Sequence, residues 1–375
     1  MGVPSAYWRN LALAGAAAAA APFALYDLYL WLLSYLTDPF RNDFSFYYAA
    51  ARLGLDHGWS RLYDLSLQQQ ELDALGSGIH VAQLARFISP PPLAWLAVPF
   101  ALMPYQAGYL AWSLLEVLCL GLTWFLLAPG RGWPRAIWLL VALGFLPVAY
   151  GLQLGQPPLL VVAAVAGAWA LLRAGREVPA GALLAVAAVK PQLGLLVPFA
   201  LLLLGHRRAF AAWAVTAALL AAAALASLGP DGTATYLDRL RFAGGLATNQ
   251  ELTLAYFLPL PVARVLEGLV ALAALAAVWR SRSLELGISA ALAGGLLASP
   301  YVHLDDLTLL VPAAWLFLRA QPARWIWAVL AAAAAAVESL ALLGPLAALA
   351  GETAVFAVIL VAAAGRVGFA ACRTA

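Results

Sequence analysis

Long apolar segments recur along this chain and restrict what it can fold into. A helix that crosses the hydrocarbon core of a bilayer needs about 20 apolar residues. Segments of this kind lie near 11–36, 105–128, 134–151, 156–172, 179–204, 209–228, 258–279, 284–298, 306–319, 324–343 and 346–364. The sequence therefore predicts an all-α polytopic membrane protein.

Composition supports this class and argues against a nucleic-acid partner. Hydrophobic residues make up 65% of the chain and charged residues 10%, whereas a soluble domain is about half apolar and about a quarter charged. The sequence pI is about 8.9, but the chain has no run of basic residues and its one lysine is Lys190. The arginines lie between apolar segments, where membrane topology explains them.

The apolar segment 179–204 is interrupted by Lys190 and Pro191. Proline removes a backbone donor and disfavours helix in the residue before it, so this segment is either one kinked span or two short helices that meet at Lys190. Suppose that the chain turns there, that the N-terminus is cytoplasmic, and that "SPPPLAWLAVPFALMP" lies at the outer surface or re-enters. A set of short arginine-containing loops then becomes cytoplasmic, as the positive-inside rule requires. These loops are "PGRGWPR", "RAGRE", "GHRR", "WRSRS" and "RAQPAR", together with Arg366 and Arg373. We therefore expect a bundle of about 11–13 transmembrane helices with both termini inside.

This topology places the long polar segments on the outer face. They are 37–104 and 229–257, with short turns at "GLQLGQPP", "VKPQ" and "ASPYVHLDD". We predict a single integral membrane domain over 1–375, in which the first outer loop, 37–104, forms a subdomain with short interfacial helices. Any chemistry is expected on this outer face.

Asp43 lies near the start of the first outer loop, beside the aromatic residues of "DFSFYY". Apolar positions recur at helical spacing after it, so Asn42 or Asp43 is a candidate N-cap that accepts backbone N–H groups. Asp43 is also a candidate general base, because a carboxylate at the boundary of water and lipid stays ionised and meets a lipid-borne substrate. The two roles are compatible.

Several segments resemble glycosyltransferase family 87, in order over roughly positions 10 to 320. They are "NDFSFYYAAARLGL", "ISPPPLAWLAVPFALMP", the stretch from "GLQLGQPP" to "VKPQLG", "NQEL" and "ASPYVHLDDLTLLVPA". This family belongs to the GT-C superfamily, whose enzymes use polyprenyl-phosphate sugars and carry an essential acid in the first outer loop. The resemblance implies a GT-C-like bundle, with Asp43 at the position of that acid.

The same resemblance implies an inverting transfer of a hexose, expected to be mannose, from a polyprenyl-phosphate donor to an outward-facing glycolipid or glycan. Asp43 takes the acceptor proton, and the phosphate leaves as a stable anion without a general acid. It needs cations or hydrogen-bond donors near its oxygens. No cofactor or metal is expected. The protein is expected to be multi-pass in the inner or plasma membrane, with its active site on the outer face and membrane lipids around it.

Lys190 is the leading candidate to contact the donor phosphate. A cation within an apolar segment is a functional hypothesis by default, and this one lies at a break that opens outward. The alternative is a lysine that snorkels at a helix end. Gln156 in "GQPP" faces the same side, where it either holds a sugar hydroxyl or caps a helix turn.

His303, Asn249, Gln250 and Arg241 complete the predicted substrate-binding residues. His303 either donates to the phosphate or the acceptor, or is a satisfied interfacial histidine. One histidine with two nearby carboxylates does not make a specific ligand spacing, so no metal site is predicted. Asn249 and Gln250 lie in the last large outer loop, where Arg241 either reaches phosphate or pairs with Asp238.

Two other classes of membrane protein compete with a transferase. Asp27, Glu116 and Glu338 fall within apolar segments, which is also a pattern of transporters and lipid-sugar flippases. Transporters commonly have two similar halves with paired broken helices, whereas this chain has one break. An O-antigen ligase or polymerase is also polytopic and outward-facing, but such proteins usually place their large outer loop late in the chain.

Overall fold

The computed structural model describes residues 5–76, 78, 87–320, 323 and 325–365. Helices account for 82% of the described residues, and no strand occurs among them. The predicted all-α membrane class is therefore confirmed. Arg324, Arg366 and Arg373, which entered the topology prediction, lie outside the described residues.

Five helices in the described part of the chain are long and apolar enough to cross a membrane. A sixth candidate is a pair of helices, α6 (Trp133–Leu143) and α7 (Leu146–Leu154), that bend by 61° at a short break. The five are α1 (Ser5–Thr37), α5 (Tyr105–Leu127), α11 (Arg207–Gly244), α13 (Leu260–Ser281) and α18 (Pro345–Ala363).

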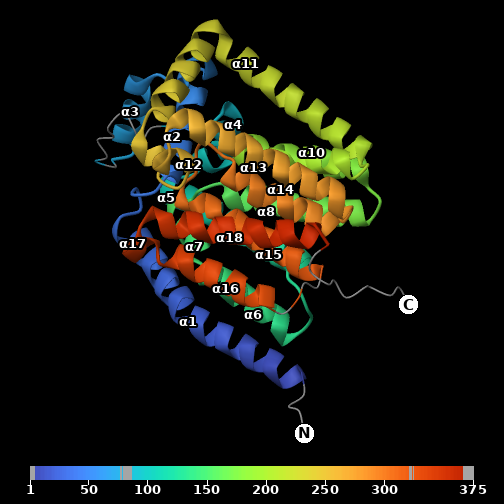
Figure 1. The fold of residues 1–375 in the computed structure, drawn as a ribbon. Coiled ribbons are helices and arrows are strands. Elements are labelled where there is room, and N and C mark those ends of the chain that lie inside the picture. The colour runs from blue at the N-terminus through green and yellow to red at the C-terminus, as the bar shows by residue number, and fades with distance from the viewer. Residues whose placement is uncertain (1–4, 77, 79–86, 321–322, 324, 366–375) are drawn as a thin grey trace.

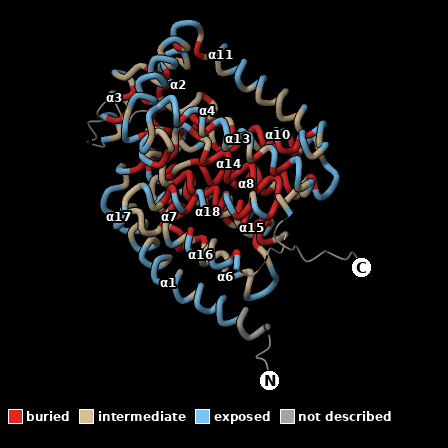
Figure 2. The backbone as a smooth tube through the Cα atoms, in the orientation of Figure 1, coloured by how far each residue is buried: buried red, intermediate tan, exposed pale blue. Residues whose placement is uncertain are grey.

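The five or six candidate spans in the described residues are fewer than the 11–13 transmembrane helices predicted. Most of the other predicted segments correspond to shorter apolar helices, and two of these lie at the centre of the bundle. Helices α8 (Pro158–Arg173) and α14 (Leu284–Leu297) are buried over most of their length, whereas α1 and much of α11 are exposed (Figure 2). A helix that is apolar on every side is expected in the core. The other short apolar helices are α4 (Pro91–Ala101), α9 (Glu177–Leu184), α10 (Leu196–Leu203), α15 (Leu310–Arg319) and α16 (Trp325–Glu338).

The predicted break at Lys190 is confirmed, and it separates two short helices. Helix α9 continues as a 3-10 turn, η2 (Ala185–Val189), and the chain then leaves helical geometry at Lys190, with φ −147°. A second 3-10 turn, η3 (Pro191–Leu193), leads into α10. Lys190 therefore lies in a gap between two helical segments, which places its side chain inside the bundle.

Glu338 accepts a backbone N–H group at a second helix break, between α6 and α7. The N–H of Leu146, at the start of α7, donates to Glu338 Oε1 at 2.7 Å. A bend between α6 and α7 leaves N–H groups without intrahelical partners, and inside a membrane these must find another acceptor. Glu338, one of the acids that suggested a transporter, thus has a structural partner.

The predicted outer loop contains short helices before α4, namely α2 (Phe44–His57), η1 (Trp59–Arg61) and α3 (Leu65–Ala74). They lie at one end of the bundle, and α1 begins and α18 ends toward the other (Figure 1). Residues 77 and 79–86 of this loop lie outside the described residues. The assignment of 37–104 as an outer-face subdomain stays a prediction. The remaining elements are η4 (Ala247–Asn249), α12 (Leu254–Phe257), η5 (Leu304–Leu309) and α17 (Leu340–Leu343).

Candidate functional site

Asn42, and not Asp43, caps helix α2. The Asn42 side-chain oxygen accepts the backbone N–H of Ser45 at 3.0 Å and the hydroxyl of Tyr105 at 3.1 Å. Asp43 makes no side-chain capping bond. Because the neighbouring amide satisfies the helix start, the Asp43 carboxylate remains available for other contacts.

The Asp43 carboxylate is held instead by Gln156, which is 113 residues away in the chain. Gln156 Nε2 donates to Asp43 Oδ2, and the Asp43 N–H donates to the carbonyl of Leu154 at 2.8 Å. Gly155, with φ +69°, makes this approach possible, because a Cβ there would lie 2.9 Å from the Cβ of Phe44. The "GQPP" turn after α7 therefore brings Gln156 to Asp43.

Lys190 joins the other side of Gln156 and is paired with two acids. Its ammonium donates to Gln156 Oε1 at 3.3 Å and to Asp305 Oδ2 at 2.7 Å, and it also forms an ion pair with Asp306. Lys190 is 9% exposed, Asp305 1% and Asp306 0%. A buried ammonium is costly unless it is paired and hydrogen-bonded, so these contacts explain why the chain tolerates it here.

The resulting cluster is a continuous chain of contacts from Asp43 through Gln156 and Lys190 to the acids of η5. Asp43 is partly buried at one end of it. Burial raises the pKa of the Asp43 carboxyl to about 6, the charge of Asp305 adds to this effect, and the Gln156 hydrogen bond and Lys190 oppose it. A carboxyl with such a pKa is largely ionised at neutral pH and accepts a proton more readily than an ordinary aspartate.

His303 lies beside this cluster. The imidazole ring packs on the Tyr301 ring, with the two centroids 4.8 Å apart. The backbone N–H of His303 donates to Asp306 Oδ2 at 2.9 Å. The ring Nε2 is buried and has no hydrogen-bond partner among the described residues. Burial, and then the charge of Lys190, lower the pKa of His303, so the neutral imidazole is favoured near the cluster.

The last outer loop makes mainly local contacts. Asn249 Nδ2 donates to the Ala243 carbonyl at 2.7 Å, and Gln250 Nε2 donates to the Gly244 carbonyl at 2.8 Å. Arg241 is exposed and pairs with Asp238 at 2.9 Å. These bonds hold the end of α11, and no contact in the described structure joins these three residues to Asp43. Their assignment to substrate binding stays a prediction.

Asp305 and Asp306 are the partners that sequence reasoning did not assign to Lys190. The sequence showed them only as carboxylates next to His303. One indication was present, because a lone lysine in an apolar segment needs a counter-charge and "HLDD" supplies two acids in another turn. Within the described residues, no three His, Cys, Asp or Glu side chains are grouped closely enough to hold a metal ion.

The fold and this cluster define a polytopic membrane protein with a connected carboxylate, amide and ammonium at one end of a helical bundle. The sequence model of glycosyltransferase family 87 matches residues 87–300, more than half of the chain. No curated protein and no solved structure matches this chain. The chain belongs to glycosyltransferase family 87, and this membership favours a transferase over the transporter and flippase hypotheses.

Proposed function

We propose that this protein is an inverting GT-C glycosyltransferase. It moves a hexose, with mannose as the proposed sugar, from a polyprenyl-phosphate donor to an outward-facing glycolipid or glycan acceptor. The observation that carries the proposal is the Asp43 carboxylate, which does not cap α2 and is oriented by Gln156. Asp43 is proposed as the general base.

The proposed reaction proceeds in one displacement. The acceptor hydroxyl oxygen attacks the anomeric carbon while its proton passes to Asp43. The bond from that carbon to the phosphate oxygen breaks, and its electron pair leaves with polyprenyl phosphate. A phosphate is a stable anion, so no protonated leaving-group acid is needed, and neither is a metal cofactor in this proposal. A pKa of about 6 suits a base that works near neutral pH.

The place of Asp43 in the chain supports a lipid-borne donor. It follows the last residue of α1, Thr37, by six positions, so it lies close to the end of a candidate span. A base at that level reaches both a lipid-linked phosphate and a polar acceptor. We propose the inner or plasma membrane, with Asp43 on the outer face and both termini cytoplasmic, because the short arginine-containing loops between apolar segments then obey the positive-inside rule.

The neighbours of Asp43 receive distinct roles in this proposal. Gln156 orients the base, and the Nε2 of His303 contacts the donor or the acceptor. Lys190 is proposed to contact the donor phosphate. Since two carboxylates already pair with its ammonium, its contribution to donor binding needs a separate test. In the folded fraction of Lys190→Ala, KM for the donor should rise more than KM for the acceptor, and equal changes would contradict this role.

The test of the base is Asp43→Asn in purified full-length protein. Sugar transfer from polyprenyl-phosphate mannose to a panel of glycolipid acceptors should fall by about 10²–10⁴, the usual contribution of a general base. The matched control is Asp56→Asn on the same helix, because Asp56 is exposed and its ion pair in the described part of the chain is with Arg52. Full activity in Asp43→Asn would refute the assignment. If the wild-type protein uses another lipid-linked sugar and still depends on Asp43, the base assignment holds and the proposed sugar changes.

A further inference from the structure

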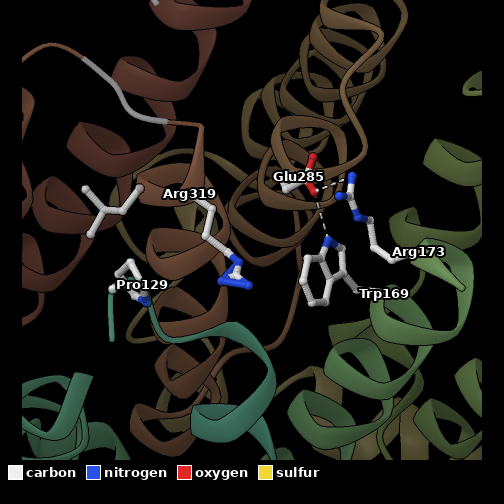
Figure 3. Close-up of a pocket in the computed structure, with 7 residues that line it drawn as sticks. Pro129, Trp169, Arg173, Glu285 and Arg319 are labelled. Atoms are coloured by element: carbon white, nitrogen blue, oxygen red, sulfur yellow. Dashed lines mark hydrogen bonds and ion pairs between the residues drawn. The ribbon is translucent and has the colours of Figure 1, made fainter. Parts of the chain in front are cut away.

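A pocket with two arginines lies at the far end of helix α8 from Gln156. Helix α8 has 16 residues, so its two ends are about 24 Å apart. The pocket has a volume of 390 Å³ and is lined by Trp169 and Arg173 of α8, Glu285 of α14, Leu318 and Arg319 of α15, and the turn Pro129–Gly130. We call it the basic pocket (Figure 3).

Positive charge is in excess in the basic pocket. Glu285 accepts the indole N–H of Trp169 at 3.2 Å and lies 3.7 Å from Arg173 Nη1. Arg319 stacks over the Trp169 ring, with its guanidinium carbon 4.8 Å from the ring centroid. No ion pair of Arg319 occurs among the described residues. Figure 3 shows the two arginines on either side of Trp169. One carboxylate thus faces two guanidinium groups, which leaves the pocket ready for an anion.

A large apolar cavity adjoins the basic pocket. It has a volume of 1070 Å³, shares Pro129, Gly130 and Leu318 with the basic pocket, and is lined by α1, α6, α15, α16 and α18. The walls are mainly alanine, valine, leucine and tryptophan side chains. Water is poorly held in an apolar cavity because it finds few hydrogen-bond partners there. In a membrane, hydrocarbon is the occupant that such walls favour.

We propose that the basic pocket and the apolar cavity together bind one anionic phospholipid. Its phosphate lies between Arg173 and Arg319, and its acyl chains enter the apolar cavity past Pro129 and Leu318. A soluble phosphate would use only the basic pocket, whereas a neutral lipid would use only the apolar cavity. The junction of the two favours an amphipathic anion. This site is separate from Asp43 and does not depend on the proposed function.

The site also adds a contact to a helix at the edge of the bundle. Only 17% of the most apolar window of α1 is buried inside the structure, and α1 forms one wall of the apolar cavity. Acyl chains in that cavity fill the space between α1 and the core helices α15 and α18. The bound lipid should therefore raise the thermal stability of the protein, because a ligand that binds the folded state stabilises it.

The experiment uses full-length protein that has been delipidated and placed in phosphatidylcholine nanodiscs with increasing phosphatidylglycerol of the same acyl chains. Retained lipid is counted by native mass spectrometry, and Tm is measured in parallel. Phosphatidylglycerol should be retained and should raise Tm. In the double variant Arg173→Gln/Arg319→Gln, its dissociation constant should rise about 30-fold, since each basic residue contributes about 1 kcal/mol and 1.4 kcal/mol is tenfold.

The control variant is Arg208→Gln, which removes an exposed arginine at the start of α11, at the same end of the bundle. It should retain phosphatidylglycerol as the wild type does. A second variant, Ala334→Trp, narrows the apolar cavity and should reduce lipid retention with both arginines intact, which keeps the test decisive if the double variant does not fold.

Three results would overturn the proposal. One is equal retention of phosphatidylglycerol by the double variant and the wild type. Another is an equal rise in Tm from phosphatidylcholine alone, which would make the headgroup charge irrelevant. The third is a full effect from inorganic phosphate without lipid, which would assign the basic pocket to a soluble anion.

Discussion

Positive charge is balanced by neighbouring carboxylates at one end of helix α8 and is in excess at the other end. At the Gln156 end, the Lys190 ammonium is buried and is in contact with two carboxylates and an amide. At the Arg173 end, two guanidinium groups line a pocket that holds one carboxylate, Glu285, which pairs with Arg173, and the Arg173 side chain is 64% exposed. The first arrangement is closed by the protein's own groups, whereas the second is open to an external anion.

This difference shows what burial demands of an ionisable group. A buried charge must find its partners within the fold, since water cannot solvate it. An arginine at the end of a membrane helix keeps contact with water or with lipid headgroups, so its charge can remain unbalanced.

Removal of the Lys190 charge should have the largest effect on stability. Lys190→Ala leaves Asp305 and Asp306 buried without their cation, and breaking a buried pair typically costs about 3–5 kcal/mol. Arg173→Gln, at the open end, should cost about 1 kcal/mol or less, as for other exposed pairs. The free energies of unfolding in detergent, measured by denaturant titration, check both values.

A rescue variant sharpens this result. Lys190→Ala combined with Asp305→Asn and Asp306→Asn leaves no unpaired buried carboxylate in η5, so part of the lost stability should return. Similar losses for Lys190→Ala and Arg173→Gln would show that the two ends do not differ as described.

Gln156→Leu should reduce the rate of sugar transfer, and it should lower the free energy of unfolding by less than Lys190→Ala does. The substitution removes the donor to Asp43, and a hydrogen bond to a charged group contributes about 1.5–3 kcal/mol. The Asp43 carboxylate then becomes easier to protonate, so the acid limb of the pH–rate profile should move upward by about one to two pH units. A lower rate with an unmoved limb would assign Gln156 to substrate binding instead of orientation of the base.

The wild-type rate should fall in acid because Asp43 acts only when ionised. Its pKa, raised by burial to about 6, lies above the ordinary aspartate value. The carboxylate fraction therefore grows as pH rises through 6 and levels off above it. Transfer at low donor concentration should be about tenfold lower at pH 5 than on the plateau. A flat profile between pH 5 and pH 7.5 would contradict Asp43 as the base.

A chelator should have the smallest effect. Ethylenediaminetetraacetate is expected to leave the transfer rate unchanged, because the phosphate leaves as an anion and the proposed contacts come from side chains. Loss of activity that a divalent ion restores would instead direct attention to the carboxylates beside His303. Asp305→Asn would then be the variant to assay for metal dependence.

Periodicity and composition were enough for the class of this protein. Apolar length predicts membrane helices, and Pro191 predicts the break at Lys190, because both follow from local backbone chemistry. The predicted segments 156–172 and 284–298 nearly match α8 (Pro158–Arg173) and α14 (Leu284–Leu297). The burial of these two helices at the centre of the bundle could not be predicted in this way, because it depends on packing between distant segments.

Local chemistry placed a carboxylate at the start of α2, but both Asn42 and Asp43 were suitable caps. Only the folded chain distinguished them, by setting Tyr105 and Ser45 against Asn42 and Gln156 against Asp43. The pairing of Lys190 with Asp305 spans 115 residues. Contacts of that kind depend on how the helices pack. The sequence alone does not show which residues, far apart along the chain, lie within hydrogen-bonding distance of each other.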